Sequence, residues 1–269
     1  MKKTTLITGS TDGIGLETAK ALVAQGHHVL IHGRNPAKLD EVEGLLSGLA
    51  GEGRVESYVA DLSQMDEVEA LAKAVAERHD ELDVLINNAG VYRTPAPITQ
   101  DGLDVRFMVN TIAPYLLTQR LLPLVGESGR VINLSSAAQN PVDLEALAGR
   151  IRLSNEYEAY AQSKLAITMW SRSIALAHQG GPVCVAVNPG SLLATKMVKE
   201  GFGMPGKDIN VGVDVLIRAA FSLEFATASG KYFDNDSGQF SSPHPDALDS
   251  WKCNNIVKVI EGILADLKK

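Results

Sequence analysis

The chain has 269 residues, of which 45% are hydrophobic and 21% are charged, and its formal net charge is −7. This composition is typical of a soluble globular protein with a substantial core, and the acidic balance argues against general nucleic-acid binding. Cys184 and Cys253 show no metal-type spacing, so we expect no bound metal. The apolar run in MKKTTLITG is too short for a signal peptide, and no stretch has the length of a membrane span. We therefore expect a cytoplasmic protein with no membrane span.

Short β-branched segments alternate with longer helical patterns along the chain. The expected strands are TTLITG, HVLIHG, VESYVAD, DVLINNAG, RVINLSS and VCVAVNPG. The expected helices cover residues 14–25, 36–49, 65–78, 102–122 and 156–178. The strands lack polar alternation, as parallel strands do when both faces of a sheet are buried. The pattern predicts a single domain of the α/β class, a Rossmann-type doubly wound parallel sheet, with its ligand beyond the carboxyl ends of the strands.

A glycine-rich turn follows the first expected strand and opens the first expected helix. Its residues are Gly9, Ser10, Thr11, Asp12, Gly13, Ile14 and Gly15. Glycines allow a phosphate to approach the backbone closely, and a helix N-terminus offers free N–H groups to a pyrophosphate. The spacing G-x-x-x-G-x-G differs from the usual dinucleotide G-x-G-x-x-G, and no Gly-Lys-Ser/Thr follows as in a P-loop. The turn predicts a nucleotide site, with a plain glycine turn as the alternative.

The motifs TGSTDGIG, NNAG, SS, YAQSK and PG occur in one order along the chain, between about residues 4 and 233. In that order they resemble the short-chain dehydrogenase/reductase family. Ser136 and Tyr160 are 24 positions apart, which is longer than in many members. This extension, together with GKYF at 230–233, resembles the retinol-dehydrogenase-like members.

The end of the second expected strand indicates which nicotinamide cofactor is bound. An NAD enzyme usually carries an acid here for the ribose 2′-hydroxyl, but position 33 is glycine. Arg34 instead offers a guanidinium suited to a 2′-phosphate, and Ser10 and Thr11 offer hydroxyl donors. Asp12, an acid in the same turn, weighs against this, and Arg34 is alternatively a solvated charge. We expect NADP(H), with NAD(H) less favoured.

The resemblance implies further contacts with the cofactor. Asp61 would accept a hydrogen bond from the adenine amino group, unless it only caps the following helix. The remaining implied contacts lie beside the adenine (Leu62), the adenosine ribose (Asn88, Ala89, Gly90) and the nicotinamide carboxamide (Pro189, Gly190, Thr195).

Tyr160 and Lys164 are four positions apart, so they lie on one face of a helix. Tyrosine has a pKa of about 10, and a nearby lysine cation lowers it, which would make Tyr160 a general acid in reduction and a base in oxidation. The resemblance implies that Lys164 also holds the nicotinamide ribose and that Ser136 binds the substrate carbonyl. Alternatively, Tyr160 and Lys164 are exposed surface residues of a helix, and Ser136 caps a helix. Tyr157 is either a pocket wall or a surface residue.

Asn110 precedes Pro114 by four positions in an expected helix. Because proline has no N–H, the Asn110 carbonyl is left free or the helix is kinked there. The resemblance implies a water at this carbonyl that links Lys164 to solvent. The alternative is a kink that affects packing alone.

Two internal segments depart from the family pattern, as does the C-terminal extension. Residues 140–157 contain a short amphipathic helix that either shapes the substrate pocket or elaborates the surface. Residues 191–210 predict a substrate lid, with Met197, Phe202 and Met204 on its apolar inner face.

The C-terminal extension, about residues 241–269, predicts a loop and a terminal helix with Trp251 packed against the body. Before it, a seventh strand is expected near Lys231. Members of the family often form oligomers through two long helices, so the resemblance implies a homo-oligomer, unless the segment at 140–157 blocks or remodels that contact.

These patterns predict an NADP-dependent short-chain dehydrogenase/reductase that transfers a hydride between nicotinamide and an apolar aldehyde, ketone or alcohol. One alternative is a ketoacyl-carrier reductase, which would need a basic patch for its carrier protein, and none is clear near the expected lid. The other is a non-catalytic NADP-binding regulator, which would not need the complete set of Asn110, Ser136, Tyr160 and Lys164.

Overall fold

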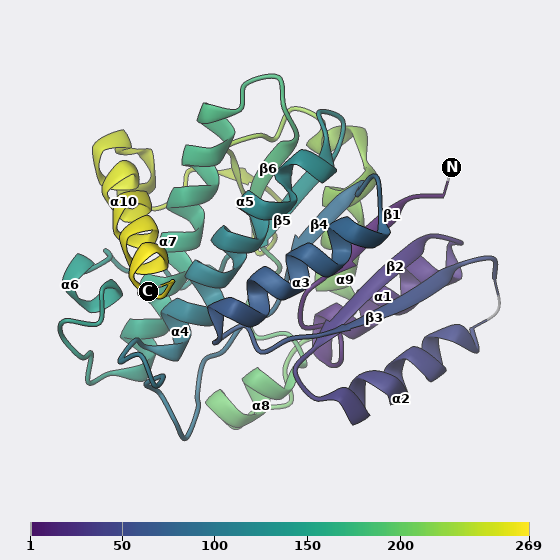
Figure 1. The fold of residues 1–269 in the computed structure, drawn as a ribbon, viewed down its shortest axis with the longest axis horizontal. Helices are drawn as coiled ribbons and strands as arrows, with labels where there is room; N and C mark the ends of the chain where they lie inside the picture. The colour runs from purple at the N-terminus through teal and green to yellow at the C-terminus, as the bar shows by residue number, and fades with distance from the viewer. Residues whose placement is uncertain (1, 50, 269) are drawn as a thin grey trace.

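The computed structural model describes residues 2–49 and 51–268, which form an α/β domain around one eight-stranded sheet (Figure 1). The strand order is β3-β2-β1-β4-β5-β6-β7-β8, in which β1 to β7 are parallel and β8 is antiparallel to β7. The strands are β1 (Thr4–Ile7), β2 (His28–Gly33), β3 (Arg54–Val59), β4 (Val84–Asn87), β5 (Arg130–Leu134), β6 (Val183–Asn188), β7 (Tyr232–Asp234) and β8 (Gln239–Ser241).

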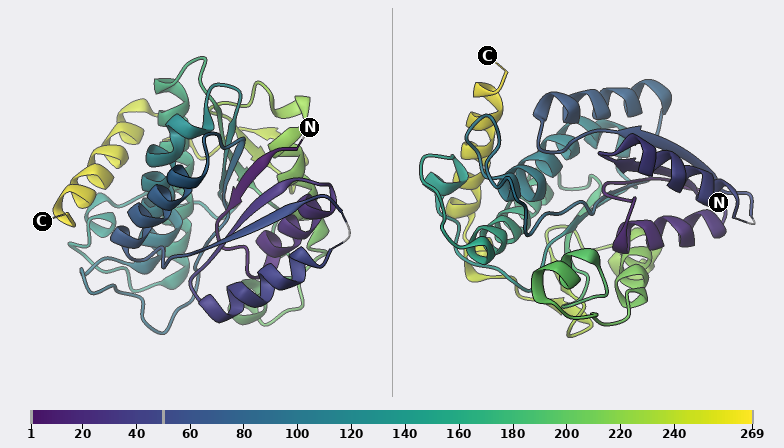
Figure 2. Two further views of the ribbon diagram at one scale, coloured as in Figure 1. Left: turned by 45° about the vertical axis from the view of Figure 1, so that its right-hand side comes forward. Right: turned by 90° about the horizontal axis from the view of Figure 1, so that it is seen from below.

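Helices cover both faces of the sheet (Figure 2). One layer packs on the cluster that contains Leu6 and Leu30, and the other packs on the cluster that contains Ile7 and Ile31. Successive strand residues therefore enter different cores, which is why the strands lack polar alternation. The first layer holds α3 (Met65–Arg78), α5 (Ala113–Val125) and α7 (Glu156–Ala177), and the second holds α1 (Gly13–Ala24), α2 (Pro36–Ser47) and α9 (Asn210–Phe221). Within the two described ranges, no helix is long and apolar enough to cross a membrane.

The strand order reverses direction between β1 and β4, and this confirms the predicted doubly wound sheet. In such sheets the ligand crevice opens at the carboxyl ends of the two strands where the order reverses. The strand expected near Lys231 is β7. The antiparallel edge strand β8 was not predicted.

The single helix predicted over residues 102–122 is instead three consecutive pieces. They are α4 (Val105–Phe107), a π-helical segment η1 (Met108–Ile112) and α5. In η1 the N–H of Ala113 donates to the carbonyl of Met108, five residues back. Pro114 stands in the first turn of α5, where its missing N–H is tolerated. The break predicted at Asn110 is thus a widened turn of the helix.

Two further helices lie in segments that depart from the family pattern. The insertion at 140–157 contains a helix, but of one turn only, α6 (Leu144–Leu147). The terminal helix α10 (Ser250–Asp266) lies along α7 (Figure 1). Trp251 is 72% exposed, so the prediction that it packs on the body was wrong. The face of α10 that is buried carries Cys253, Ile256, Ile260 and Ile263.

Candidate active site

The glycine turn after β1 lies directly against the loop after β4. Gly9 has a φ of +65°, and a Cβ atom added there would lie 2.8 Å from the Cα of Ala89. A Cβ at Gly15 would lie 2.4 Å from the amide nitrogen of Asn88. That same nitrogen donates to the carbonyls of Thr8 and Gly9, at 2.8 and 3.0 Å. Any side chain at Gly9 or Gly15 would collide with the loop after β4, so these glycines let the turn pack against that loop. A pyrophosphate at the N-terminus of α1 stays a prediction.

Two buried side chains, those of His32 and Ser10, form hydrogen bonds that hold the glycine turn in place. His32 accepts from the N–H of Gly9 through Nδ1 and bonds the carbonyl of Ala60 through Nε2, each at 3.0 Å. Burial lowers the pKa of His32 to about 4, so the ring stays neutral, with Nε2–H donating. The Ser10 hydroxyl accepts from the N–H of His32 at 2.8 Å and donates to the carbonyl of Ile7 at 3.0 Å. The Ser10 side chain is fully buried, so the prediction that its hydroxyl faces a phosphate is not supported.

The corner expected to hold a 2′-phosphate lies at the end of β2. Arg34 is exposed, and a Cβ added at Gly33 would lie 2.5 Å from the side chain of Thr11. An acid at position 33 would therefore displace Thr11. Asp12 forms an ion pair with Lys38, whose Nζ lies 3.1 Å away. Burial opposes ionisation of Asp12, but its hydrogen bonds to Lys38 and to the turn lower its pKa overall. Lys38, four positions after Arg34, was not identified from the sequence.

Asp61 and Leu62 follow β3. One carboxylate oxygen of Asp61 accepts from the N–H and the hydroxyl of Ser63, at 2.9 and 2.8 Å. These bonds lie in the turn before α3, whose N-cap residue is Gln64, so Asp61 does not cap that helix as the alternative interpretation expected. The role of Asp61 at the adenine stays a prediction. The side chain of Leu62 is buried in the core.

The expected catalytic residues meet at the carboxyl edge of the sheet. Ser136 lies close enough to the Tyr160 hydroxyl to lower the pKa of that phenol. The Nζ of Lys164 lies 5.8 Å from the centre of the Tyr160 ring and donates to the carbonyl of Leu134 at 2.7 Å. A Cβ at Gly90 would lie 3.5 Å from the same Nζ. The glycine after β4, the serine after β5 and the two residues of α7 thus surround one point.

The electrostatics of the pair differ from the sequence prediction. Burial raises the pKa of Tyr160, against the lowering effect of its hydrogen bond to Ser136. Burial also lowers the pKa of Lys164 to about 8. The predicted lowering of the tyrosine pKa by the lysine is therefore wrong for the protein alone. The reason is geometric, because the ammonium is directed at the Leu134 carbonyl and desolvation dominates both groups.

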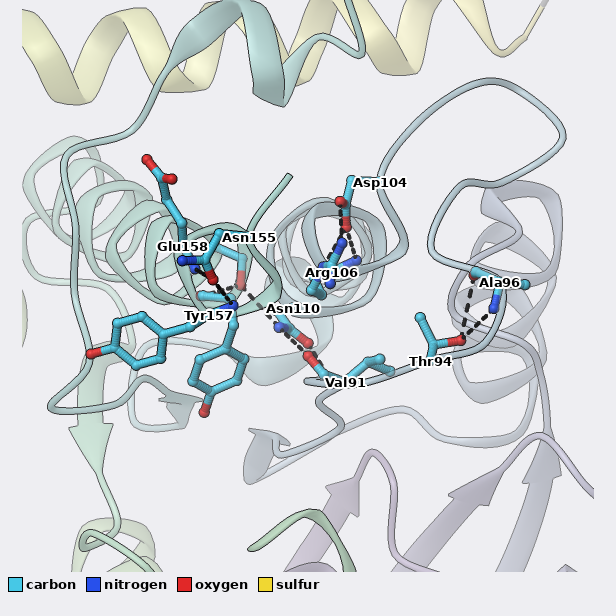
Figure 3. A network of polar contacts seen from close by, with 11 residues as sticks. Val91, Thr94, Ala96, Asp104, Arg106, Asn110, Asn155, Tyr157 and Glu158 are labelled. Atoms are coloured by element: carbon cyan, nitrogen blue, oxygen red, sulfur yellow. Dashed lines mark hydrogen bonds and ion pairs between the residues drawn. The ribbon is translucent and has the colours of Figure 1, made fainter. Parts of the chain in front are cut away.

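Asn110 is fully buried in η1 and uses its side chain to join two elements. Its Oδ1 accepts from the N–H of Val91 at 2.7 Å, and its Nδ2 donates to the Val91 carbonyl and to the Ser163 hydroxyl, each at 2.9 Å (Figure 3). The Ser163 hydroxyl donates to the Tyr160 carbonyl at 2.7 Å. This link from the loop after β4 to the tyrosine turn of α7 was not anticipated. The expected role of the Asn110 carbonyl stays a prediction.

The aromatic ring of Tyr92 lies beside Tyr160. The ring of Tyr92 meets the Tyr160 ring edge-on, with centroids 5.2 Å apart. A Cβ added at Gly201, in α8 (Lys196–Phe202), would lie 2.8 Å from the Tyr92 ring. Tyr157, in the first turn of α7, is 44% exposed (Figure 3). Tyr92 was not identified from the sequence, where its signal was an aromatic residue two positions after Gly90.

The segment at 191–210 lies next to the candidate site, and its two ends pair with each other. Leu193 and Lys207 form a β-bridge at its base. The methyl group of Thr195 would lie 3.5 Å from a Cβ at Gly13, so this segment contacts the glycine turn.

The three side chains expected on the inner face of that segment differ in their positions. The methyl group of Met197 would lie 3.7 Å from a Cβ at Gly90, so Met197 faces the site. Met204 is 40% exposed, which does not support an inward position. The side chain of Phe202 lies outside the part of the chain that the structure describes.

The turn at 189–190 is held by the hairpin between β7 and β8. The amide of Asn235 donates to the Pro189 carbonyl at 2.9 Å. Asp236 accepts from the N–H of Ser191 at 2.8 Å and from the amide of Asn188 at 2.9 Å. These hairpin residues were not singled out from the sequence, although Asp-Asn-Asp-Ser-Gly is a typical turn composition.

The strand order and the position of the glycine turn define a doubly wound α/β protein of the dinucleotide-binding type. Within this class, the family model described as short chain dehydrogenase matches residues 3–204. The chain belongs to this family of oxidoreductases.

Named relatives support the resemblance to retinol-dehydrogenase-like members. The chain is 31% identical to retinol dehydrogenase 13 of Homo sapiens, over 92% of this chain and 80% of the relative. It is 33% identical to polyprenol dehydrogenase of Homo sapiens, over 86% of this chain and 76% of the relative.

Among solved structures, the NADPH-bound carbonyl reductase from chicken fatty liver is similar, with a TM-score of 0.70 and 25% identity over 90% of this chain and 99% of that chain. A metagenomic short-chain oxidoreductase in complex with NADP has a TM-score of 0.62 and 28% identity, over 86% of this chain and 93% of that chain.

Proposed function

We propose that this protein is an NADP-dependent oxidoreductase that transfers a hydride between nicotinamide and an apolar aldehyde, ketone or alcohol. The observation that carries the proposal is the meeting of Ser136, Tyr160 and Lys164 beside Gly90, at the sheet edge that also holds the glycine turn. A purely cofactor-binding regulator would not need this set.

The residues around the turn fit a nicotinamide dinucleotide phosphate. The glycine turn and the N-terminus of α1 would receive the pyrophosphate. Arg34 would meet the 2′-phosphate, with Lys38 offsetting the charge of Asp12. The remaining contacts would be those implied for the adenosine (Asp61, Leu62, Asn88, Ala89) and the nicotinamide (Pro189, Gly190, Thr195). NADP complexes among the similar structures support the choice of NADP over NAD.

The chain's own residues then position the substrate and move one proton. The reduced nicotinamide supplies the hydride when it is bound. Ser136 orients the carbonyl oxygen, and Tyr160 donates the proton to it. The Tyr160 hydroxyl is protonated at neutral pH, as donation requires, although burial raises its pKa and makes it a weaker acid than a free tyrosine in the protein alone. Lys164 supplies positive charge near the developing alkoxide and the ribose.

Apolar side chains near Tyr160 support an apolar substrate. Tyr92 lies against Tyr160 and α8, and Met197 faces the site from the segment at 191–210. We propose that this segment is a substrate lid. The named relatives include dehydrogenases of retinol and polyprenol, which agrees with a long apolar carbonyl or alcohol.

The experiment that tests the function is NADPH oxidation, followed optically, against a panel of short polar and long apolar aldehydes and ketones, with NADH in parallel. The proposal expects turnover with NADPH preferred, fastest on apolar carbonyls. Preference for NADH would contradict the cofactor assignment. Fastest turnover on short polar carbonyls would contradict the substrate class.

A further inference from the structure

A second cluster of polar side chains lies at the opposite end of the sheet from Tyr160. His28 is the first residue of β2, Glu56 lies within β3, and His79 follows the last residue of α3. Glu56 is in register with Leu30, two residues beyond His28, so His28 and Glu56 point to the same face of the sheet. Leu30 packs in the core cluster that includes α3, so this is the face that α3 covers.

The three side chains converge through atoms that bind metals. One ligand atom from each of the three residues lies within 4.8 Å of the other two. The Nε2 of His28 is 2.9 Å from one carboxylate oxygen of Glu56, and the Nε2 of His79 is 3.2 Å from the other. The two imidazole rings meet edge-to-face, with centroids 5.4 Å apart.

Hydrogen bonding alone does not account for the cluster. The Nε2 of His28 is buried and, among the described residues, has no hydrogen bond of acceptable geometry, although a carboxylate oxygen lies 2.9 Å away. A buried polar atom without such a bond requires an explanation.

A neighbouring phenol supports the carboxylate. The hydroxyl of Tyr58 lies 3.2 Å from the Glu56 oxygen and 3.1 Å from the Nε2 of His79. Groups that hydrogen-bond to a ligating carboxylate orient it toward the metal ion.

We propose that His28, Glu56 and His79 bind one Zn²⁺ ion, with water as the fourth ligand. Tetrahedral zinc has Zn–N and Zn–O distances of about 2.0–2.2 Å, so its ligand atoms lie about 3.3–3.6 Å apart. Small rotations of the three side chains reach that spacing from the present distances.

The composition of the cluster selects the type of metal. Two imidazoles and one carboxylate suit zinc and similar transition metals, whereas Ca²⁺ and Mg²⁺ require several oxygen ligands. The ion would tie the end of α3 to the β2–β3 edge of the sheet. The sequence gives no spacing signal for it, because each ligand comes from a separate element.

The test is calorimetric titration of Zn²⁺ into the untagged, full-length chain after removal of metals by a chelator. We expect one Zn²⁺ per chain with a dissociation constant in the micromolar range or below. The variants His28→Gln, Glu56→Gln and His79→Gln should each weaken binding at least about tenfold, and Tyr58→Phe should weaken it less. His178→Gln, which changes an exposed histidine just beyond α7, is the matched control and should bind as the wild type does.

Co²⁺ absorption and thermal melting provide independent readouts. Bound Co²⁺ should give the intense visible bands of a tetrahedral site in the wild type, and Zn²⁺ should raise the melting temperature of the wild type but not that of His79→Gln. If His79→Gln does not fold, the effect of Zn²⁺ on the melting temperature is compared between the wild type and His28→Gln instead. The proposal is overturned if the wild type binds no stoichiometric Zn²⁺, or if folded ligand variants bind it as tightly as His178→Gln does.

Discussion

The two halves of the candidate site are held together by different kinds of contact. In the half that would receive the cofactor, backbone lies against backbone, as where Gly9 meets Ala89, and polar side chains such as Asn88 and His32 bond to main-chain groups. In the half around Tyr160, side chains meet side chains, as in the Tyr92–Tyr160 contact and the link from Asn110 to Ser163.

The difference indicates how each half tolerates change. Backbone contacts leave no room for even a methyl group, so the cofactor half depends on which positions are glycine. Side chains can repack, so residues that line the substrate half, such as Tyr92, can change while Tyr160 and Lys164 keep their positions. Substitutions in the first half should therefore change cofactor binding, and substitutions in the second half should change turnover or substrate affinity.

The largest expected effect is that of Tyr160→Phe. Removing the hydroxyl removes the proposed proton donor, so the turnover number should fall by about 10²–10⁴-fold. Steady-state kinetics measures the fall, and NADPH fluorescence checks that cofactor affinity changes little. Tyr157→Phe, three positions earlier and exposed, is the control and should retain most activity. Near-full turnover by Tyr160→Phe would contradict its role.

Gly9→Ala should mainly weaken NADPH binding. The added methyl group would lie 2.8 Å from the Ala89 Cα, so the glycine turn and the loop after β4 would have to move apart, which distorts the proposed pyrophosphate site. We expect at least about a tenfold loss of affinity, together with the strain of about 1–3 kcal/mol that a non-glycine residue bears at positive φ. Gly26→Ala is the matched control, since Gly26 has a φ of +86° and nothing within 4 Å of the added atom. Equal losses of NADPH affinity in both variants would show that strain, and not the contact, is responsible.

Arg34→Ala should reduce the preference for NADPH over NADH by about 10- to 100-fold, because a hydrogen-bonded charge contributes about 1.5–3 kcal/mol. Dissociation constants for both cofactors measure the change, and the NADH value should stay constant. Lys38→Ala should have a smaller effect, since Lys38 is paired with Asp12. An unchanged NADPH affinity in Arg34→Ala would remove the basis for the cofactor assignment.

Carbonyl reduction should depend on the charge of Lys164. With a pKa of about 8 in the folded protein, its ammonium is lost above that pH, so kcat/KM should fall by about tenfold between pH 7 and pH 9. Because the folded pKa lies below the usual 10.5, the unfolded chain binds more protons between the two values, and the Lys164 contribution to stability rises with pH in that window. In Lys164→Met the alkaline fall in kcat/KM should disappear, and its persistence would assign the titration to another group.

The smallest expected effect is that of Arg93→Ala. Arg93 pairs with Glu156 of α7 at 3.1 Å and donates to the Glu200 carbonyl of α8 at 3.4 Å. Exposed pairs of this kind typically contribute about 0.2–1 kcal/mol, so KM for the substrate should rise by about 1.4- to fivefold while kcat stays constant. Arg150→Ala, which breaks an exposed pair with Glu145 in the insertion, should leave KM unchanged. Identical KM values for the two variants would argue against a lid held by Arg93.

The sequence predicted the parallel strands and the helices that flank them, except α9, because their patterns are local. A strand such as β2 is apolar throughout, since both of its faces are buried. The edge strand β8 has no such pattern, as it is three residues long and depends on its turn with β7. The π-helical turn at Asn110 was only indicated, because Pro114 predicts a break in the helix and not its geometry.

The identities of the candidate site residues were more predictable than their electrostatics. Motifs placed Ser136, Tyr160 and Lys164 near one another, and the structure brings them together. The direction of the Tyr160 pKa shift was wrong, because it depends on burial and on where the Lys164 ammonium points. For the same reason, the sequence could not show that the Ser10 hydroxyl is used inside its own turn.

Transfer of the hydride from NADPH to a carbonyl substrate can be followed with a deuterium label. The protein would be incubated with NADPH deuterated at nicotinamide carbon 4 and a mixture of apolar aldehydes and ketones, and the alcohols would be analysed by mass spectrometry, with deuterated NADH in parallel. We predict deuterium on the carbinol carbon of one or more alcohols, formed faster with NADPH than with NADH. Tight binding of NADPH without deuterium transfer, together with no oxidation of the corresponding alcohols by NADP⁺, would contradict it.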